Sequence, residues 1–315
     1  MQTYNFSNDQ QIRWCPGCGD YAILKYLQQA LEKKGLKPDE VVVISGIGCA
    51  SRLPYYLSCY GFHTIHGRAP CIATGIALAN PNLPVIIITG DGDGLSIGLH
   101  HLMHMLRRNV NVTVLLLNNR VYGLTKGQAS PTSQLGQITK TSLDGHQEQP
   151  LEGLAVALAS GATMIGRCLD TQGILMQRLI SASLDHEGTS LIEIYQNCPI
   201  FNDQAFASLG RQVIDNPMLC SVWPGESISY DTNKTLVLHE GEWVIKENEL
   251  QTIYQGKKNH AQLLLELKKP VIVGLFYQEK TRSFFKVNRS NLDLKGSFER
   301  ACHRLLTWEI DANKD

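Results

Sequence analysis

Short, continuous apolar runs alternate along the chain with longer stretches in which apolar residues recur every three or four positions. The short runs are typical of strands buried on both faces, and the longer pattern is typical of helices with one buried face. The apolar runs predict strands at 41–44, 85–89, 112–117, 163–166 and 191–195, and the periodic stretches predict helices at 21–31, 73–79, 95–106, 151–160 and 173–183. Such alternation is the signature of a parallel sheet covered on both faces. We therefore predict a doubly wound, mostly parallel α/β domain over residues 1–205.

The pattern changes beyond residue 205. Residues 217–234 mix Pro, Gly, Ser and Asp, as loops do. Beyond them, short strands are predicted at 235–239, 242–245 and 271–276, with a helix at 261–267. The last residues are polar and weakly periodic, apart from 298–306. We assign residues 206–315 to a smaller C-terminal α/β extension and tail.

The charge balance narrows the range of partners. The 29 basic and 29 acidic residues of this 315-residue chain cancel, so the sequence lacks the basic excess typical of proteins that bind nucleic acid or anionic lipid. Its apolar runs are far shorter than the roughly 20 residues of a membrane helix. The first ten residues are polar, unlike a secretion signal. We expect a cytoplasmic protein with protein and small-molecule partners, in which the nine cysteines stay reduced.

Polar and glycine-rich segments follow four of the predicted strands. They begin at Ser45, Gly90, Asn118 and Gln196. Ligands of open parallel sheets bind just beyond the carboxyl ends of the strands, because helix N-termini and loops converge there. One edge of the predicted sheet is therefore expected to carry the chemistry.

Two of these segments together predict a diphosphate site. Asp91, the amide oxygen of Asn119 and the carbonyl oxygen of Val121 are oxygen ligands suited to Mg²⁺, which would hold a diphosphate. Gly90 and Gly92 allow the backbone to approach phosphate closely. A GDG followed by NN after one βαβ unit resembles the diphosphate-binding motif of thiamine diphosphate enzymes. A nicotinamide site is disfavoured because no G-x-G-x-x-G follows the first strand.

The cysteines allow more than one type of site. Cys15 and Cys18 form a C-x₂-C, which serves thiol redox chemistry, zinc or an iron–sulfur cluster. The residues before it are polar, which disfavours a thioredoxin-like strand. Cys49 and Cys198 follow predicted strands at the Asp91 edge, so four thiolates could hold zinc or a [4Fe–4S] cluster there. Cys168 also follows a predicted strand and remains an alternative ligand.

Eight segments together resemble the β subunit of 2-oxoacid:ferredoxin oxidoreductases, with the 2-oxoglutarate type closest. They lie within about residues 11–205 and occur in the order of that family. The segments are WCPGCG at 14–19, GIGCASR at 46–52, YGFH at 60–63, HGR at 66–68, GDGDG at 90–94, NN at 118–119, YGLTKGQ at 122–128 and NCP at 197–199. The resemblance implies a fold of the thiamine diphosphate-binding type, with thiamine diphosphate and Mg²⁺ as cofactors. It also implies one [4Fe–4S] cluster held by Cys15, Cys18, Cys49 and Cys198, and so favours Cys198 over Cys168.

Residues of these segments are predicted to contact cofactor or substrate. Arg52, three residues after Cys49, is placed to meet a substrate carboxylate, although arginine is also common on surfaces. Lys126 is a second catalytic candidate. The predicted cofactor contacts are Gly48, Cys49, His66, Gly67, Arg68, Gly90, Asp91, Gly92, Asp93, Asn119, Val121, Tyr122, Gly123, Leu124 and Thr125.

The resemblance implies oxidative decarboxylation of a 2-oxoacid to acyl-CoA and CO₂, with electrons passing through the cluster to ferredoxin. Thiamine diphosphate enzymes need a second α/β domain, whose glutamate protonates the aminopyrimidine. We expect a partner α subunit to supply that domain, in a dimer of αβ units that is inactive when this chain is isolated. Two alternatives are a non-oxidative thiamine transferase or decarboxylase half-subunit, and a zinc-stapled subunit without catalysis.

Overall fold

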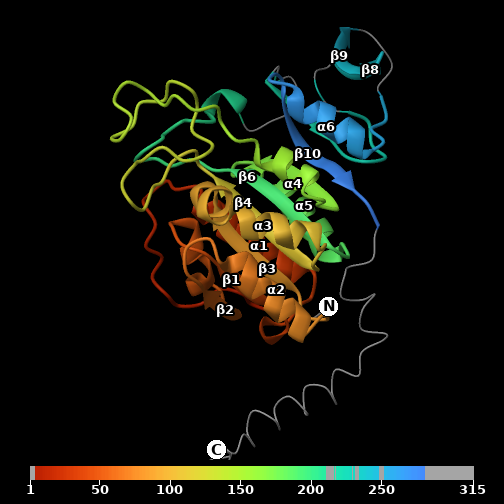
Figure 1. Cartoon of the computed structure of the whole chain (residues 1–315). Coiled ribbons are helices and arrows are strands. Elements are labelled where there is room, and N and C mark those ends of the chain that lie inside the picture. The colour runs from red at the N-terminus through yellow and green to blue at the C-terminus, as the bar shows by residue number, and fades with distance from the viewer. Residues whose placement is uncertain are drawn as a thin grey trace, which may run out of the picture.

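A single mixed sheet dominates the computed structural model, which describes residues 4–210, 216, 218–228, 230, 234–247 and 252–280. Within these residues, eight strands follow the order β2-β1-β3-β4-β6-β5-β10-β7. Figure 1 shows β2, β1, β3, β4, β6 and β10 one after another across this sheet. Every pairing is parallel except that of β10 with β5. The predicted doubly wound, mostly parallel sheet is confirmed. Its strands are β1 (Val42–Ser45), β2 (Tyr60–His63), β3 (Val85–Gly90), β4 (Val112–Asn118), β5 (Met164–Leu169), β6 (Thr189–Tyr195), β7 (Leu219–Val222) and β10 (Val271–Gln278).

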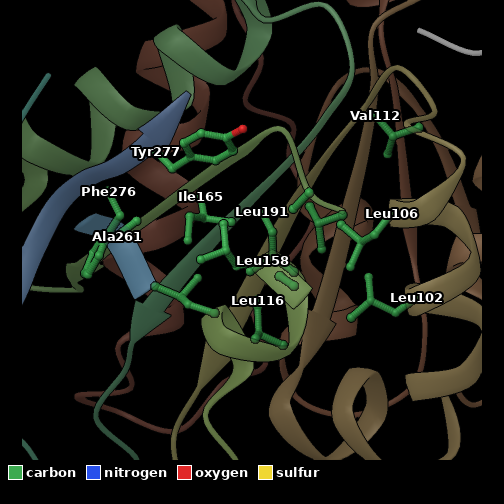
Figure 2. Packing of buried hydrophobic residues seen from close by; sticks show 14 of the residues in the cluster. Leu102, Leu106, Val112, Leu116, Leu158, Ile165, Leu191, Ala261, Phe276 and Tyr277 are labelled. Carbon is green, nitrogen blue, oxygen red and sulfur yellow. The ribbon is translucent and has the colours of Figure 1, made fainter. Parts of the chain in front are cut away.

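Helices cover both faces of the sheet because consecutive strand side chains point to opposite sides. On β4, Val114 and Leu116 pack with one group of helices, whereas Leu115 and Leu117 pack with the other. Figure 2 shows the first face, where Leu116 lies near Leu158 and Leu191. The helices of this face are α2 (Ala69–Ala79), α3 (Leu99–Arg107), α4 (Gly153–Ala159) and α6 (Lys258–Glu266), and those of the other are α1 (Asp20–Lys33) and α5 (Gly173–Asp185).

Most of the predicted strands and helices have counterparts within a few residues, and the differences lie where the apolar signal is weak. Strand β2 was not predicted because it is an edge strand with all four residues exposed. Strand β7 was not predicted because it lies in the segment rich in Pro, Gly, Ser and Asp. The predicted helix at 95–106 is divided into a π-helical turn, η3 (Asp93–Ile97), and α3.

The C-terminal extension contributes to the same sheet. Strand β10 pairs with β5 on one side and with β7 on the other, while β8 (Lys234–His239) and β9 (Glu242–Glu247) form a separate antiparallel hairpin. The boundary near residue 205 stays a prediction, since strands on both sides of it share one sheet. The predicted tail, including residues 298–306 and Cys302, lies outside the described residues. Among the helices described, none combines the length and apolar character needed to cross a membrane.

The strand order places a crevice beside β1. The chain runs from β1 outward to β2 and then returns to β3 on the other side of β1. The connection after β1 leads to β2, and the connection after its neighbour β3 leads in the opposite direction, to β4. Where the connections of two neighbouring strands diverge in this way, a gap opens at their carboxyl ends, and ligands of such sheets bind there. The loops after β1, β3 and β4 all reach this gap.

Candidate cofactor site at the carboxyl ends of the strands

A small pocket of about 90 Å³ lies at this crevice, and we call it the Asp91 pocket. Except for Gly67 and Arg68, every residue predicted to contact the cofactor lines it. The tertiary structure therefore brings together residues that are 77 positions apart in sequence, from Gly48 to Thr125 (125 − 48 = 77). Its lining is Ile47, Gly48, Cys49, Ala50, His66, Gly90, Asp91, Gly92, Asp93, Leu117, Asn119, Val121, Tyr122, Gly123, Leu124 and Thr125.

Asp91 is held in place by two hydroxyl groups. It follows β3 and is 2% exposed. Its Oδ2 accepts hydrogen bonds from Ser130 Oγ at 2.5 Å and from Thr132 Oγ1 at 2.6 Å. Burial raises the pKa of Asp91 above its ordinary value, whereas the two hydroxyls favour the charged form and oppose that shift. A buried carboxylate of fixed orientation is a suitable ligand for a hard divalent cation.

The loop after β4 presents the two other predicted magnesium ligands. Asn119 Oδ1 accepts a hydrogen bond from the Val121 N–H at 3.1 Å, which forms a tight turn around Arg120 at φ 60°. Tyr122 then donates its hydroxyl to the carbonyl of Gly92 at 3.0 Å. This bond joins the GDG segment to the NN segment, so their oxygen atoms share one pocket. Carboxylate, amide and carbonyl oxygens form a donor set that fits Mg²⁺.

Asp93 organises the other side of the pocket. Its Oδ1 accepts hydrogen bonds from the N–H groups of Gly67 at 2.7 Å and Ile47 at 3.2 Å, and its Oδ2 accepts one from Thr89 Oγ1 at 2.7 Å. His66 Nδ1 lies 2.8 Å from Asp93 Oδ1. Asp93 therefore ties the loops after β1 and β2 to β3 and orients His66 along the pocket wall.

Gly67 and Arg68 lie outside the pocket lining. An added Cβ on Gly67 would stand 2.6 Å from the Gly98 nitrogen, and the φ of Gly67 is 70°, so this position requires glycine. Arg68 donates to the carbonyl oxygen of His66 at 3.3 Å. In this structure both residues support the His66 loop rather than face the pocket.

A second, wider cavity of about 380 Å³ adjoins the first, and we call it the cysteine cavity. Cys15, Cys18, Cys49 and Cys198 all line it. Within the described residues, however, no three His, Cys, Asp or Glu side chains are close enough together to form a metal-binding group. Four thiols around one cavity are the donor chemistry that an iron–sulfur cluster requires.

Gly123 lies between two of the thiols. A Cβ added to it would stand 3.5 Å from Cys49 Sγ and 3.8 Å from Cys198 Sγ. Burial, followed by the negative charge of Asp20, raises the pKa of Cys49 to about 11. Thiolates at this place therefore need a cationic partner, which the iron of a cluster would supply.

Cys168 occupies a different environment. It lies on β5 and is fully buried in the core packed beneath α1 and α5. It is absent from the lining of the cysteine cavity. Its position suits a small apolar core residue.

The two predicted catalytic cations line the cysteine cavity. Arg52 lies on the segment after Cys49, and Lys126 lies in the loop after β4 with a φ of 79°. Together with Arg13 they are the charged residues of a lining that contains no Asp or Glu among the residues described. The cavity is therefore suited to an anion such as a carboxylate.

Several polar residues of the site carried no recognisable sequence signal. Ser130 and Thr132 lie in a long loop without periodicity. Thr89 is the last residue of the predicted strand at 85–89, directly before the GDG segment. The SPTS segment at 130–133 contains residue types that are common in turns and gives no indication of a contact with Asp91. Its contact with Asp91 depends on how the loop folds back over β3 and β4.

Comparison with known proteins gives matches to a thiamine pyrophosphate family and to subunits of 2-oxoacid oxidoreductases. The family model described as "Thiamine pyrophosphate enzyme, C-terminal TPP binding domain" matches residues 40–194. The chain is 51% identical over 229 residues to 2-oxoglutarate oxidoreductase subunit KorB of Mycobacterium tuberculosis, covering 73% of this chain and 61% of that protein. It is 41% identical to 2-oxoglutarate synthase subunit KorB of Archaeoglobus fulgidus, covering 64% of this chain and 76% of that protein.

A solved structure is also similar over nearly the whole chain. It is 2-oxoglutarate:ferredoxin oxidoreductase from Magnetococcus marinus with 2-oxoglutarate, coenzyme A and succinyl-CoA bound, at a TM-score of 0.76 and 30% identity, covering 94% of each chain. The aligned region spans about three-fifths of the first curated relatives, 61% and 60% of their lengths. The chain belongs to the family of β subunits of 2-oxoacid:ferredoxin oxidoreductases.

Proposed function

We propose that this chain is the β subunit of a cytoplasmic enzyme that converts a 2-oxoacid, coenzyme A and oxidised ferredoxin to acyl-CoA, CO₂ and reduced ferredoxin. The observation that carries the proposal is the wall shared by the two cavities. Cys49, Asn119, Gly123 and Leu124 line both the Asp91 pocket and the cysteine cavity. A site for an organic cofactor thus directly adjoins a site with four thiols, as electron transfer between them requires.

The residues of the Asp91 pocket fit thiamine diphosphate held through Mg²⁺. Asp91, Asn119 and Val121 would hold the metal ion, and the glycines after β3 and β1 would allow phosphate to approach the backbone. When bound, thiamine diphosphate supplies the carbon nucleophile and stabilises negative charge after decarboxylation. This chain contributes the diphosphate half of the site, and the α subunit would complete it in a dimer of αβ units.

The residues of the cysteine cavity fit a [4Fe–4S] cluster. Cys15, Cys18, Cys49 and Cys198 would be its ligands. Gln196 Nε2 donates to Cys18 Sγ at 3.2 Å, and such bonds to a ligand sulfur raise the reduction potential of a cluster. When bound, such a cluster would supply a one-electron acceptor beside the organic cofactor, with ferredoxin as the final acceptor.

We assign substrate binding to the cations of the same cavity. Arg52 and Lys126 would meet the carboxylate of the 2-oxoacid, and His66, oriented by Asp93, would donate a hydrogen bond at the cofactor. The names of the relatives favour 2-oxoglutarate as the substrate, and pyruvate is our second candidate. The distal carboxylate of 2-oxoglutarate suits a cavity lined by three cationic side chains.

The test is anaerobic purification of the chain together with its α subunit, followed by iron and sulfide analysis and a viologen reduction assay. We expect a brown complex with about four iron and four sulfide per chain, and dye reduction that requires coenzyme A and is faster with 2-oxoglutarate than with pyruvate. A colourless, iron-free complex with thiamine-dependent activity would support the non-oxidative alternative. One zinc per chain without thiamine diphosphate binding would support the zinc-stapled alternative.

A further inference from the structure

A buried ion pair joins the neighbouring strands β5 and β6 inside the sheet. Arg167 on β5 and Glu193 on β6 are opposite each other in the register and are only 5% and 1% exposed. Arg167 Nε donates to Glu193 Oε2 at 2.7 Å, and its Nη2 pairs with Glu152 at the start of α4. The predicted site does not include these residues.

The second oxygen of Glu193 fixes the side-chain amide of Asn118. Asn118 Nδ2 donates to Glu193 Oε1 at 2.8 Å, and Asn118 is 3% exposed at the end of β4. With the amide nitrogen directed at Glu193, the amide oxygen is directed at the loop after β4 and at Thr132. A charged acceptor strongly favours this orientation over its 180° flip.

The oxygen of Asn118 supports the predicted metal ligands from two sides. It accepts a hydrogen bond from the Arg120 N–H at 3.1 Å, within the turn that carries Asn119 and Val121. It also lies 2.9 Å from Thr132 Oγ1, the hydroxyl that holds Asp91. One amide thus touches the supports of all three oxygen ligands.

Thr132 has one proton and faces two acceptors, Asp91 Oδ2 at 2.6 Å and Asn118 Oδ1 at 2.9 Å. A cation bound to Asp91 would draw electron density from the carboxylate and make it a weaker hydrogen-bond acceptor. The hydroxyl can then turn to Asn118 without leaving its proton unbonded, which lowers the cost of metal binding. This exchange requires the amide oxygen to remain where Glu193 places it.

We propose that Glu193, held by Arg167, positions Asp91, Asn119 and Val121 for Mg²⁺ through the amide of Asn118. The inference rests on the proposed thiamine diphosphate site and assigns Glu193, Arg167, Asn118 and Thr132 as positioning residues. A buried ion pair adds little net stability compared with well-packed apolar side chains. Its orienting effect on the ligand loop therefore accounts better for charges at the centre of this sheet.

The test uses the purified complex with the α subunit and Mn²⁺ as a probe for Mg²⁺, with free Mn²⁺ measured by EPR at saturating thiamine diphosphate. Glu193→Gln keeps the size of the side chain but removes its charge. We expect Mn²⁺ binding to weaken by about 10- to 100-fold, the range typical of residues that orient metal ligands. Iron content should stay unchanged, because Glu193 is not among the residues that line the cysteine cavity.

A double-mutant cycle separates positioning from loss of stability. Asn118→Ala should weaken Mn²⁺ binding as Glu193→Gln does, and the double variant should lose little more, because the two residues act in series. Ile192→Ala is the matched control, since Ile192 is fully buried on β6 but packs on the opposite face. It should lower thermal stability and leave Mn²⁺ affinity unchanged.

A further pair of variants covers the case in which Glu193→Gln does not fold. Thr132→Val removes the hydroxyl between Asn118 and Asp91, whereas Thr132→Ser retains it. Only the valine variant should weaken Mn²⁺ binding. Equal affinity of wild type, Glu193→Gln and Thr132→Val, or additive losses in the cycle, would overturn the inference. Absence of thiamine-dependent Mn²⁺ binding by the wild-type complex would instead overturn the proposed function.

Discussion

The Asp91 pocket and the cysteine cavity share a wall but differ in how their side chains are held. In the Asp91 pocket, the carboxylates of Asp91 and Asp93 accept hydrogen bonds from hydroxyl and backbone groups at 2.5–3.2 Å. In the cysteine cavity, the four thiols surround about 380 Å³ without converging on one point in the part of the chain described. Hydrogen bonds within the fold hold the carboxylates of the first site in place, whereas in our proposal a bound cluster would draw the four thiols of the second site together.

The variants with the largest expected effect test which cysteines hold the proposed cluster. Cys198→Ser should abolish the brown colour and the 2-oxoacid-dependent dye reduction, because a [4Fe–4S] cluster would lose one of its four thiolates. Cys168→Ala should change neither, since Cys168 lies in the core beneath α1 and α5. Iron, sulfide and visible absorption measure the outcome. Loss of colour in the Cys168 variant with colour retained in the Cys198 variant would show that the proposed ligand set is wrong.

A second variant tests whether the two sites form independently. Asp91→Asn removes the negative charge of the side chain but keeps its size. Mg²⁺-dependent thiamine diphosphate binding should fall by about 100-fold or more, because losing a metal ligand should cost at least as much as losing a residue that orients one. The iron content should remain that of wild type, because the cysteines lie on other segments. Calorimetric titration and iron analysis measure the two quantities. A joint loss of iron and thiamine binding would mean that the sites assemble together.

A glycine pair tests how tightly the Asp91 pocket is built. A Cβ on Gly92 would stand 2.2 Å from Tyr122 Cε1, and that ring is held by its hydrogen bond to the Gly92 carbonyl. Gly92→Ala should lower the free energy of unfolding by about 1–3 kcal/mol, as overpacking does. Gly75→Ala, inside α2 with nothing within 4 Å, should raise it by about 0.5–1 kcal/mol. Equal effects in urea unfolding would show that the pocket is looser than this geometry implies.

A last, modest effect concerns a buried histidine that lines neither cavity. Burial lowers the pKa of His186 from 6.5 to about 4, and its Nε2 lies 2.7 Å from Thr163 Oγ1. The unfolded state therefore binds the extra proton first as pH falls below 6.5, and stability present above that pH is lost progressively down to about 4. The free energy of unfolding should fall by about 1 kcal/mol between pH 7 and 5.5, and His186→Gln should flatten this part of the profile. A profile identical to that of wild type would contradict the assignment.

The Asp91 and Asn119 motifs could be predicted because each follows an apolar strand. The runs at 85–89 and 112–117 directly precede Gly90 and Asn118, so the carboxyl-end rule placed Asp91 and Asn119 together. The supporting residues could not be predicted. Glu193 looked like one polar residue within the strand at 191–195, and only the pairing of β6 with β5 and β4 places it between Arg167 and Asn118.

Asp93 also has a supporting role that the sequence did not predict. Its place in GDGDG predicted a cofactor contact, and the structure does put it in the pocket lining. Both of its oxygens, however, accept hydrogen bonds from the protein itself. A carboxylate two residues from a predicted metal ligand can thus support the site through protein hydrogen bonds, and its predicted contact with the cofactor stays a prediction.

By itself, the sequence determined the alternation of buried strands and helices, the edge of the sheet that carries the chemistry, and the order of the motifs. These features are local, because apolar periodicity and turn residues act over a few positions. The tertiary structure alone decided that Cys168 lies in the core beneath α1 and α5, that β7 and β10 continue the sheet, and that a buried ion pair links Arg167 to Glu193. These features depend on strand order, register and loop path, which bring together residues that are distant in sequence.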